Sequence, residues 1–313
     1  HPPHHYAAQA RKDRTMARIK GLNPDWIDFS SRIPQAKTDH ITRQWRDIPY
    51  GNADLQKLDI YLPEEGDGSF PFIVNVHGGG LTACDKHDFH LYPTLFALEQ
   101  GFAVVAVNYR LSPAVRYPEH YYDLWRALCW LQQHGTSHKL DLNNIFLWGT
   151  SAGGNLVLHA GCEEGIPLPE DLQEAARSIH INAVAAMCPA IDFTQIGGTG
   201  SIIERIMTRL ILKDVNKHVF GSNKVPEDAA RLSNPTTHID KGIVPVYLQQ
   251  GTRDPAVPYQ QVEAFYRRLT GILPGEDLVF HVLEGAPHAG ASEHFFLPEN
   301  INPILEFFRR HMR

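Results

Sequence analysis

The feature that most constrains the fold of this 313-residue chain is an alternation of short apolar runs with helix-like segments. Between the runs, apolar residues recur three and four positions apart, as in Tyr121, Leu124, Trp125 and Leu128, and again over 262–269 and 301–308. That spacing indicates helices that pack one face against a sheet. The runs that we interpret as strands are 58–62, 72–76, 102–109, 145–148, 183–188, 244–249 and 278–283. The alternation predicts an α/β protein with a mostly parallel sheet.

Composition narrows the functional class. The apolar content of 43% and the charged content of 20% are ordinary for a soluble globular protein. A net charge of −6 gives no electrostatic reason to expect nucleic-acid binding or attachment to an anionic membrane. No apolar run approaches the length needed to span a bilayer. We therefore expect a small-molecule partner and a monomer or homodimer.

The N-terminus and the cysteines bear on localisation. Residues 1–15 are polar and basic, without the apolar core of a signal peptide. Cys84, Cys129, Cys162 and Cys188 are scattered without C-x-x-C spacing, which favours free thiols over a disulfide framework. These observations favour a cytoplasmic protein, although a secreted form that has lost its leader fits them too.

Two segments interrupt the alternation. Residues 1–45 carry little strand pattern, and residues 192–240 hold a glycine-rich turn, an amphipathic stretch over 202–212 and a polar loop that ends at Asp240. Open α/β sheets bind ligands at the carboxyl ends of their strands. We therefore predict a catalytic domain over 46–313, an N-terminal extension or cap element over 1–45, and a cap insertion over 192–240.

Ser151 is the leading candidate for a nucleophile. It lies in Gly149-Thr150-Ser151-Ala152-Gly153-Gly154, a G-x-S-x-G pattern between an apolar run and a helix-like stretch. A sharp turn from strand to helix lifts the serine hydroxyl out of the chain, and small neighbours keep that turn free of clashes. A serine in this setting still needs a base.

The segment His77-Gly78-Gly79-Gly80 directly follows the run at 72–76. Acyl transfer needs hydrogen-bond donors for the oxygen that becomes negative in the tetrahedral intermediate. Glycines leave backbone N–H groups unshielded, so we assign those of Gly79, Gly80 and Ala152 to an oxyanion hole. A flexible turn or a phosphate-binding loop would also contain glycines, but no phosphate-loop motif accompanies these.

An acid and a base follow later strands. Asp254 lies in Gly251-Thr252-Arg253-Asp254-Pro255 after the run at 244–249, and His288 lies in a small-residue loop after the run at 278–283. Asp192, at the end of an earlier strand, is the competing acid. The order Ser151, Asp254, His288 differs from the orders of the two common serine-protease families.

With these motifs the chain resembles the α/β-hydrolases of the hormone-sensitive-lipase-like and bacterial carboxylesterase branch. The resemblance covers residues 45–313 and rests on the glycine and serine motifs, on 107–113, and on Tyr117-Pro118 followed by Asp123. Thr150 stands where relatives commonly have aspartate. The resemblance implies an eight-stranded, mostly parallel sheet flanked by helices, with a small cap from the N-terminus and from an insertion after strand six. It gives the Asn108-Tyr109-Arg110 run a structural role.

Other candidate sites are weaker. His87-Asp88-Phe89-His90 has ligand-like spacing, but no Cys or His pattern supports a metal, and we interpret it as a solvated loop. Glu163-Glu164 is interpreted as part of a helix end and not as a glycosidase pair. We expect neither a metal nor a cofactor. The substrate-pocket candidates, which are equally compatible with simple packing, are Leu81, Phe193, Ile206 and Tyr259.

The predicted function is a serine carboxylic-ester hydrolase with a Ser-His-Asp triad and an acyl-enzyme, acting on small or short-chain acyl or aryl esters, sugar esters included. The absence of an extended apolar lid favours short acyl chains. An arylformamidase-like amide hydrolase and an acyltransferase would use the same groups. A non-catalytic binding protein on this scaffold would be expected to lack the base.

Overall fold

The computed structural model describes residues 27–313 except 29, 198–200 and 290–292. Its centre is one eight-stranded sheet with the order β10-β9-β8-β7-β5-β6-β4-β3. Neighbouring strands from β10 to β6 run parallel, and β4 and β3 are antiparallel additions at one edge. The strands are β3 (Gln44–Pro49), β4 (Lys57–Tyr61), β5 (Phe70–Val76), β6 (Ala103–Val107), β7 (Leu140–Thr150), β8 (Ala183–Met187), β9 (Val246–Gly251) and β10 (Leu278–Leu283). The predicted α/β class and eight-stranded, mostly parallel sheet are confirmed.

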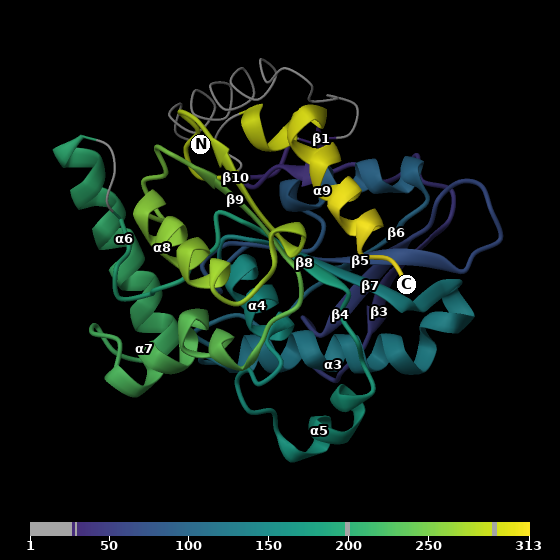
Figure 1. Cartoon of the computed structure of the whole chain (residues 1–313), viewed down its shortest axis with the longest axis horizontal. Coiled ribbons are helices and arrows are strands. Elements are labelled where there is room, and N and C mark those ends of the chain that lie inside the picture. Colours follow the sequence, from purple (N-terminus) through teal and green to yellow (C-terminus); the bar gives the residue numbers. More distant parts are fainter. Residues whose placement is uncertain (1–26, 29, 198–200, 290–292) are drawn as a thin grey trace.

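Helices cover both faces of this sheet (Figure 1). The helices are α2 (Tyr92–Leu95), α3 (Glu119–His134), α4 (Ala152–Gly161), α5 (Glu170–Arg177), α6 (Ile202–Phe220), α7 (Glu227–Ser233), α8 (Tyr259–Thr270) and α9 (Pro298–Arg310). The core on one face contains side chains of α3, α4 and α8, and the core on the other face contains side chains of α2 and α9. Because both faces are covered, β6 and β8 consist entirely of buried residues, as their apolar sequences predict.

One strand of the sheet escaped the sequence analysis. All six residues of the edge strand β3 are exposed or half-exposed and three of them are polar, so the strand shows neither an apolar run nor a clean alternation. A second, two-stranded sheet pairs β1 (Ile27–Asp28) with β2 (Gln35–Ala36) inside the segment where little strand pattern was found. Short strands of this kind are set by local pairing and leave almost no periodic signal.

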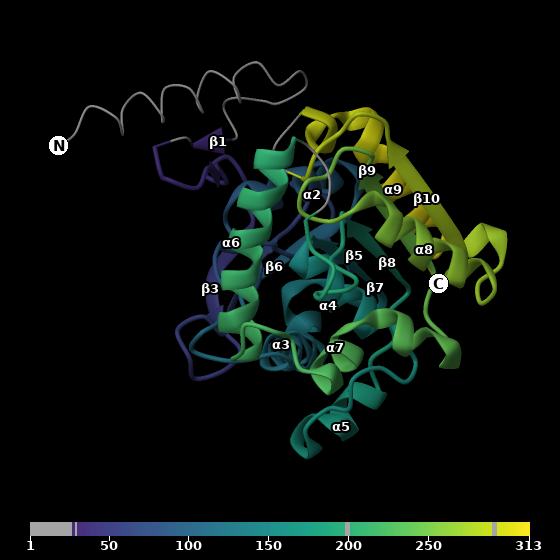
Figure 2. The same ribbon diagram turned by 90° about the vertical axis from the view of Figure 1, so that its left-hand side faces the viewer.

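The segment 192–240 is more helical than the sequence suggested. The amphipathic stretch predicted over 202–212 continues as α6 to Phe220, capped at its start by Ser201 and Glu204. The interpretation of the following stretch as a polar loop is wrong in part, because that stretch contains α7. Gly197 has a positive φ, whereas the rest of the predicted glycine turn, 198–200, lies outside the described residues. Figure 2 shows α6 on the outside of the molecule, in front of the sheet in that view.

The buried run after β6 has the structural role that the resemblance implied. The guanidinium of Arg110 donates to both carboxylate oxygens of Asp123, each at 2.9 Å, and Tyr109 stacks on His77 with ring centroids 4.5 Å apart. Asp123 is fully buried on α3. These contacts join the segment after β6 to α3 on one side and to the glycine loop on the other. Among the described helices, none is long and apolar enough to cross a membrane.

Candidate active site

The turn between β7 and α4 holds Ser151 in an unusual backbone conformation. Its φ is 57° and its ψ is −116°, outside the regions that side-chain-bearing residues ordinarily adopt. The turn is fixed from both sides, since the Ser151 N–H donates to Met187 O at 2.8 Å and the Ala190 N–H donates to Ser151 O at 3.1 Å. A conformation of this cost persists only where the surroundings impose it, which is typical of functional sites.

The glycines around Ser151 are required by close backbone contacts. A Cβ on Gly149 would lie 2.2 Å from Gly153 O, and one on Gly153 would lie 2.2 Å from Val76 O and 2.5 Å from His77 O. The serine turn and the end of β5 therefore touch backbone to backbone. This contact places the glycine loop beside Ser151.

Gly153→Ala is expected to destabilise the fold by about 1–3 kcal/mol, because the new methyl group must push β5 away from α4. Urea unfolding measures the effect. Gly275→Ala is the matched control, since no heavy atom lies within 4 Å of its Cβ position. Equal midpoints for the two variants would show that the contact is looser than described.

His288 joins Ser151 to Asp254. Its Nε2 lies 2.8 Å from Ser151 Oγ, and its Nδ1 lies 2.7 Å from Asp254 Oδ2. Asp254 is fully buried, and its Oδ1 accepts the N–H groups of Ala256 and Val257 at 2.8 and 2.9 Å. The carboxylate is thus held by its own loop, with one oxygen directed at the imidazole.

Electrostatics at this pair favour the protonated imidazole. Burial acts to lower the pKa of His288, but Cys188 and the Asp254 carboxylate outweigh it and raise the pKa of His288 well above its ordinary value. Asp192, the competing acid, instead accepts hydrogen bonds from the N–H and the hydroxyl of Thr194. The geometry therefore favours Asp254 as the partner of His288.

The glycine loop is held in place by His77. This residue is buried, its Nδ1 lies 2.6 Å from Gly78 O, and its carbonyl accepts the Tyr109 hydroxyl at 2.8 Å. Gly79 and Gly80 have φ values of 111° and 65°, which explains the choice of glycine at both. Ala152 opens α4, so its N–H belongs to the first turn, where no helical acceptor exists. No hydrogen bond within the described ranges engages the N–H groups of Gly79, Gly80 or Ala152.

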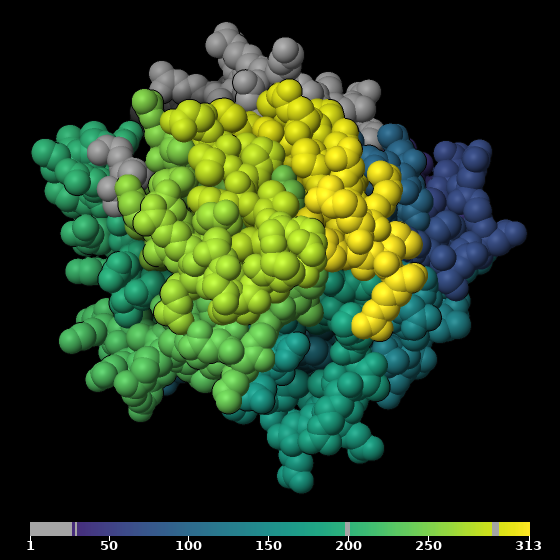
Figure 3. Space-filling model, in the orientation of Figure 1, coloured from purple at the N-terminus to yellow at the C-terminus, as the bar shows by residue number. Residues whose placement is uncertain are grey.

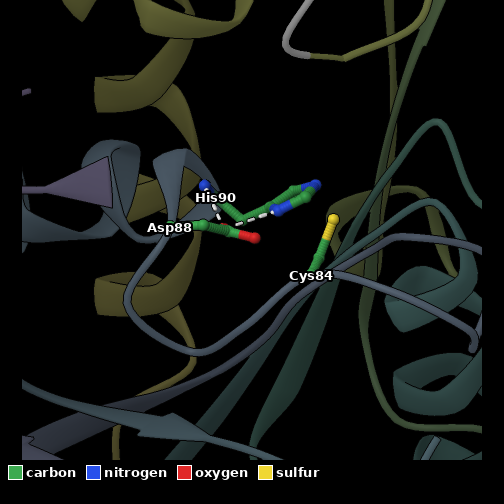
Figure 4. Close-up of side chains that lie close together, drawn as sticks. All are labelled: Cys84, Asp88 and His90. Atoms are coloured by element: carbon green, nitrogen blue, oxygen red, sulfur yellow. Dashed lines mark hydrogen bonds and ion pairs between the residues drawn. The ribbon is translucent and has the colours of Figure 1, made fainter. Parts of the chain in front are cut away.

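The stretch 87–90 is not the solvated loop that we expected. Asp88 is fully buried and His90 is 8% exposed; Asp88 Oδ1 lies 2.7 Å from His90 Nδ1 and also accepts the His90 N–H. Cys84 lies close by (Figure 4). Its thiol sulfur, a carboxylate oxygen of Asp88 and a ring nitrogen of His90 lie within 4.8 Å of one another. Burial, and after it the negative charge of Asp88, raises the pKa of the Cys84 thiol to about 12. The thiol therefore stays protonated at neutral pH. The cluster thus supports the glycine loop, since a Cβ on Gly79 would lie 2.8 Å from Cys84 Sγ.

The predicted pocket residues are dispersed. Leu81 is fully buried next to the glycine loop, and Phe193 is buried against Tyr117 and Phe220. Tyr259 stacks on Phe280 at 5.9 Å and donates to Glu263, whereas Ile206 points outward and is 55% exposed. These contacts are packing contacts, and substrate binding by the four residues remains a prediction.

Sequence reasoning missed two contacts near the site. Cys188 directly follows β8, and its thiol sulfur lies within 4.8 Å of a carboxylate oxygen of Asp254 and a ring nitrogen of His288. Val215 of α6 faces the glycine loop, because a Cβ on Gly80 would lie 3.0 Å from it. Neither residue belongs to a motif; Cys188 could have been found from its place at a parallel strand end, where the other site residues also lie.

The chain is similar in sequence and in fold to known esterases. The family model described as BD-FAE matches residues 58–269. The probable carboxylic ester hydrolase LipM of Mycobacterium tuberculosis is 28% identical over 302 residues, and the esterase LipQ of the same organism is 28% identical over 227 residues. These alignments cover 90% and 71% of this chain. The chain spans 68% of LipM and about half of LipQ, 52%.

A solved structure described as a truncated form of a carbohydrate esterase from gut microbiota superposes with a TM-score of 0.73. It is 19% identical, and the superposition covers 88% of this chain and 99% of that one. This likeness shows a shared fold. The family match extends over more than half of the sequence and includes the glycine loop, the serine turn and Asp254. The chain therefore belongs to the BD-FAE family, a hormone-sensitive-lipase-like family of α/β-hydrolases, which confirms the predicted family and the predicted carboxylesterase type of enzyme.

Proposed function

We propose that the chain is a serine carboxylic-ester hydrolase that works through Ser151, His288 and Asp254. The single observation that carries the proposal is the position of His288, whose two ring nitrogens lie 2.8 Å from Ser151 Oγ and 2.7 Å from Asp254 Oδ2. A general base must lie within hydrogen-bond reach of the proton that it removes, and a third group must hold its tautomer. Both conditions are met by these distances.

The reaction follows from the two nitrogens. Ser151 Oγ attacks the ester carbonyl while His288 Nε2 accepts its proton, and the Asp254 carboxylate stabilises the imidazolium that results. His288 then gives the proton to the departing alcohol, which leaves an acyl group on Ser151. Water then attacks the acyl carbonyl while His288 Nε2 accepts its proton. The imidazolium passes that proton to Ser151 Oγ as the acid leaves, which restores the free serine and the neutral base.

The charge that develops on the carbonyl oxygen needs donors. The N–H groups of Gly79, Gly80 and Ala152 belong to two segments that meet where Gly153 touches the end of β5. Donors that are fixed before the reaction cost no reorganisation when the tetrahedral intermediate forms. Leu81, Phe193 and Tyr259 are the proposed lining of the substrate pocket, whereas Ile206 lies on the outward side of α6. The segments 1–45 and 192–240 are proposed to cap the pocket.

The proposed substrates are small or short-chain acyl and aryl esters, including acetylated sugars. The carbohydrate esterase that shares the fold suggests the sugar esters. A panel of p-nitrophenyl esters of increasing acyl length, with aryl acetates and acetylated sugars beside them, tests the class. Hydrolysis of an N-formyl aryl amine faster than of its matched ester would point instead to an amide hydrolase, and acyl transfer to an added alcohol would point to a transferase. No turnover on any of these substrates would contradict the proposal.

The pH profile should reflect the raised pKa of His288. Only the neutral imidazole accepts the serine proton, so kcat/KM is expected to fall on the acid side with a midpoint above the ordinary histidine pKa of about 6.5. Removal of the negative charge in Asp254→Asn should move the residual activity's midpoint to lower pH. A parent midpoint clearly below 6.5 would show that burial, which opposes the two partners, dominates at His288.

A further inference from the structure

The outer side of α6 carries an unusual set of exposed apolar residues. Six of them lie 55–73% exposed on successive turns, and we call them the apolar face: Ile202, Ile203, Ile206, Met207, Leu210 and Ile211. Their spacing of three and four residues places them on one side of the helix. The opposite side holds the residues that pack inward, among them Val215 and Val219. The helix is therefore apolar on two sides. Among the residues that the structure describes, none covers the outer side.

The helix is prominent at the surface. In Figure 3 its side chains project at the left edge of the molecule, and Figure 2 shows it facing the viewer along its whole length. Exposed apolar patches of this kind mark interaction sites, because water makes them costly to maintain.

The charges on α6 favour one kind of partner. The helix contains four basic residues, Arg205, Arg209, Lys213 and Lys217, against two acidic ones. Both acids are engaged locally, since Glu204 caps the helix and Asp214 lies 3.8 Å from His218. Within the described ranges no ion pair neutralises the four basic side chains. The net charge of −6 for the chain thus conceals a local positive excess.

A basic hollow adjoins the same helix. It has a volume of about 610 Å³, and its lining includes Arg209, Lys213 and Lys224 together with Asn216 and Asn223, without an acidic residue among the described lining. Arg209 and Lys213 thus line a space large enough for a phosphorylated headgroup while the next residues along the helix, Leu210 and Ile211, face outward. Apolar side chains beside cations form the pattern of a helix that lies in the surface of an anionic bilayer.

We propose that α6 docks the protein onto anionic phospholipid membranes, with the apolar face among the acyl chains and the basic hollow around headgroup phosphates. A second copy of the chain is a poorer occupant. Antiparallel pairing of two α6 helices through their apolar faces would set the flank of Arg209 and Lys213 against the same flank of the partner, so like charges would repel. Attraction to the lipid acts within about 10 Å, the Debye length, so the local charge of α6 decides it rather than the net charge.

Docking would bring the lipid close to the proposed site. Val215, on the inner side of α6, faces Gly80 of the glycine loop. The docking itself does not require hydrolysis, so the Ser151→Ala variant is expected to bind vesicles as the parent does. Failure of the proposed function and failure of docking therefore give different results.

Flotation with vesicles tests the proposal. The vesicles are phosphatidylcholine alone, and phosphatidylcholine in which about a third of the lipid is replaced by phosphatidylserine. The parent chain should float with the mixed vesicles, more weakly with the neutral ones, and less in high salt. Ile203→Gln/Leu210→Gln and Arg209→Gln/Lys213→Gln should each weaken binding to mixed vesicles by about tenfold or more. The controls Met312→Gln and Arg177→Gln/Lys241→Gln, which alter exposed apolar and basic residues elsewhere, should leave it unchanged.

Circular dichroism and hydrolysis of a water-soluble ester establish that the variants are folded. Absence of parent binding to either vesicle type would overturn the proposal, as would binding that neither double variant weakens. A dimer in sedimentation that Ile203→Gln/Leu210→Gln dissociates, without vesicle binding by the parent, would show instead that the apolar face joins two copies of the chain.

Discussion

Ser151→Ala is expected to lower kcat by about 10³-fold or more on any ester that the parent hydrolyses. The substitution removes the only oxygen that lies 2.8 Å from His288 Nε2 in the described site, so no acyl-enzyme can form. The donors of the glycine loop stay in place, which leaves some rate above that in water. Steady-state kinetics on a short p-nitrophenyl ester, with the acyl-enzyme sought by mass spectrometry, measures both effects.

The fold of this variant should be unchanged, because the backbone contacts of Ser151 with Met187 and Ala190 do not involve its side chain. Alanine must still adopt the positive φ of 57°, as serine does. Ser112→Ala is a useful control, since the Ser112 hydroxyl is a buried hydrogen-bonding group near His120. Hydrolysis by Ser151→Ala at the parent rate would disprove the assignment of the nucleophile.

Asp254→Asn is expected to lower kcat by about 10³- to 10⁴-fold with little change in structure. The asparagine oxygen should keep the two N–H groups of Ala256 and Val257, because both are fixed donors. Its NH₂ group would then face His288 Nδ1, which must become an acceptor. The ring proton then lies on Nε2, so Nε2 can no longer accept the proton of Ser151. His288 thereby loses its role as the base.

Asp192→Asn provides the comparison for that variant. Asp192 accepts from the N–H and the hydroxyl of Thr194 and is the acid that sequence order alone leaves open. The Asp192→Asn variant should retain activity within a few-fold of the parent. A greater loss in Asp192→Asn than in Asp254→Asn would mean that the acid has been misassigned.

The sequence predicted those parts of the fold that depend on strong periodicity. Six of the seven apolar runs became strands that contribute buried residues to the core, and the seventh, the edge strand β10, packs partly buried residues against both faces. The helices α3, α8 and α9 formed where apolar residues recur at helical spacing. The edge strand β3 and the helix α7 were missed, since half-exposed polar residues carry little pattern.

The candidate site was predictable where a residue follows a strand within a distinctive motif. Ser151, His288 and the glycine loop are such cases. The burial of Asp88 and His90 was not predictable, because it depends on Cys84 and the glycine loop folding back over them. The outward direction of Ile206 also could not be deduced, since α6 is apolar on two sides and the period of its sequence does not say which side meets the protein.

The groups of the candidate site follow four different strands, β5, β7, β9 and β10, and span residues 77 to 288. No local segment can assemble them, because each depends on parallel pairing between strands that are distant in the chain. Contacts of such high sequence separation form late in folding. Hydrolytic activity should therefore return only with the last stage of refolding after denaturation, behind the recovery of helical circular dichroism.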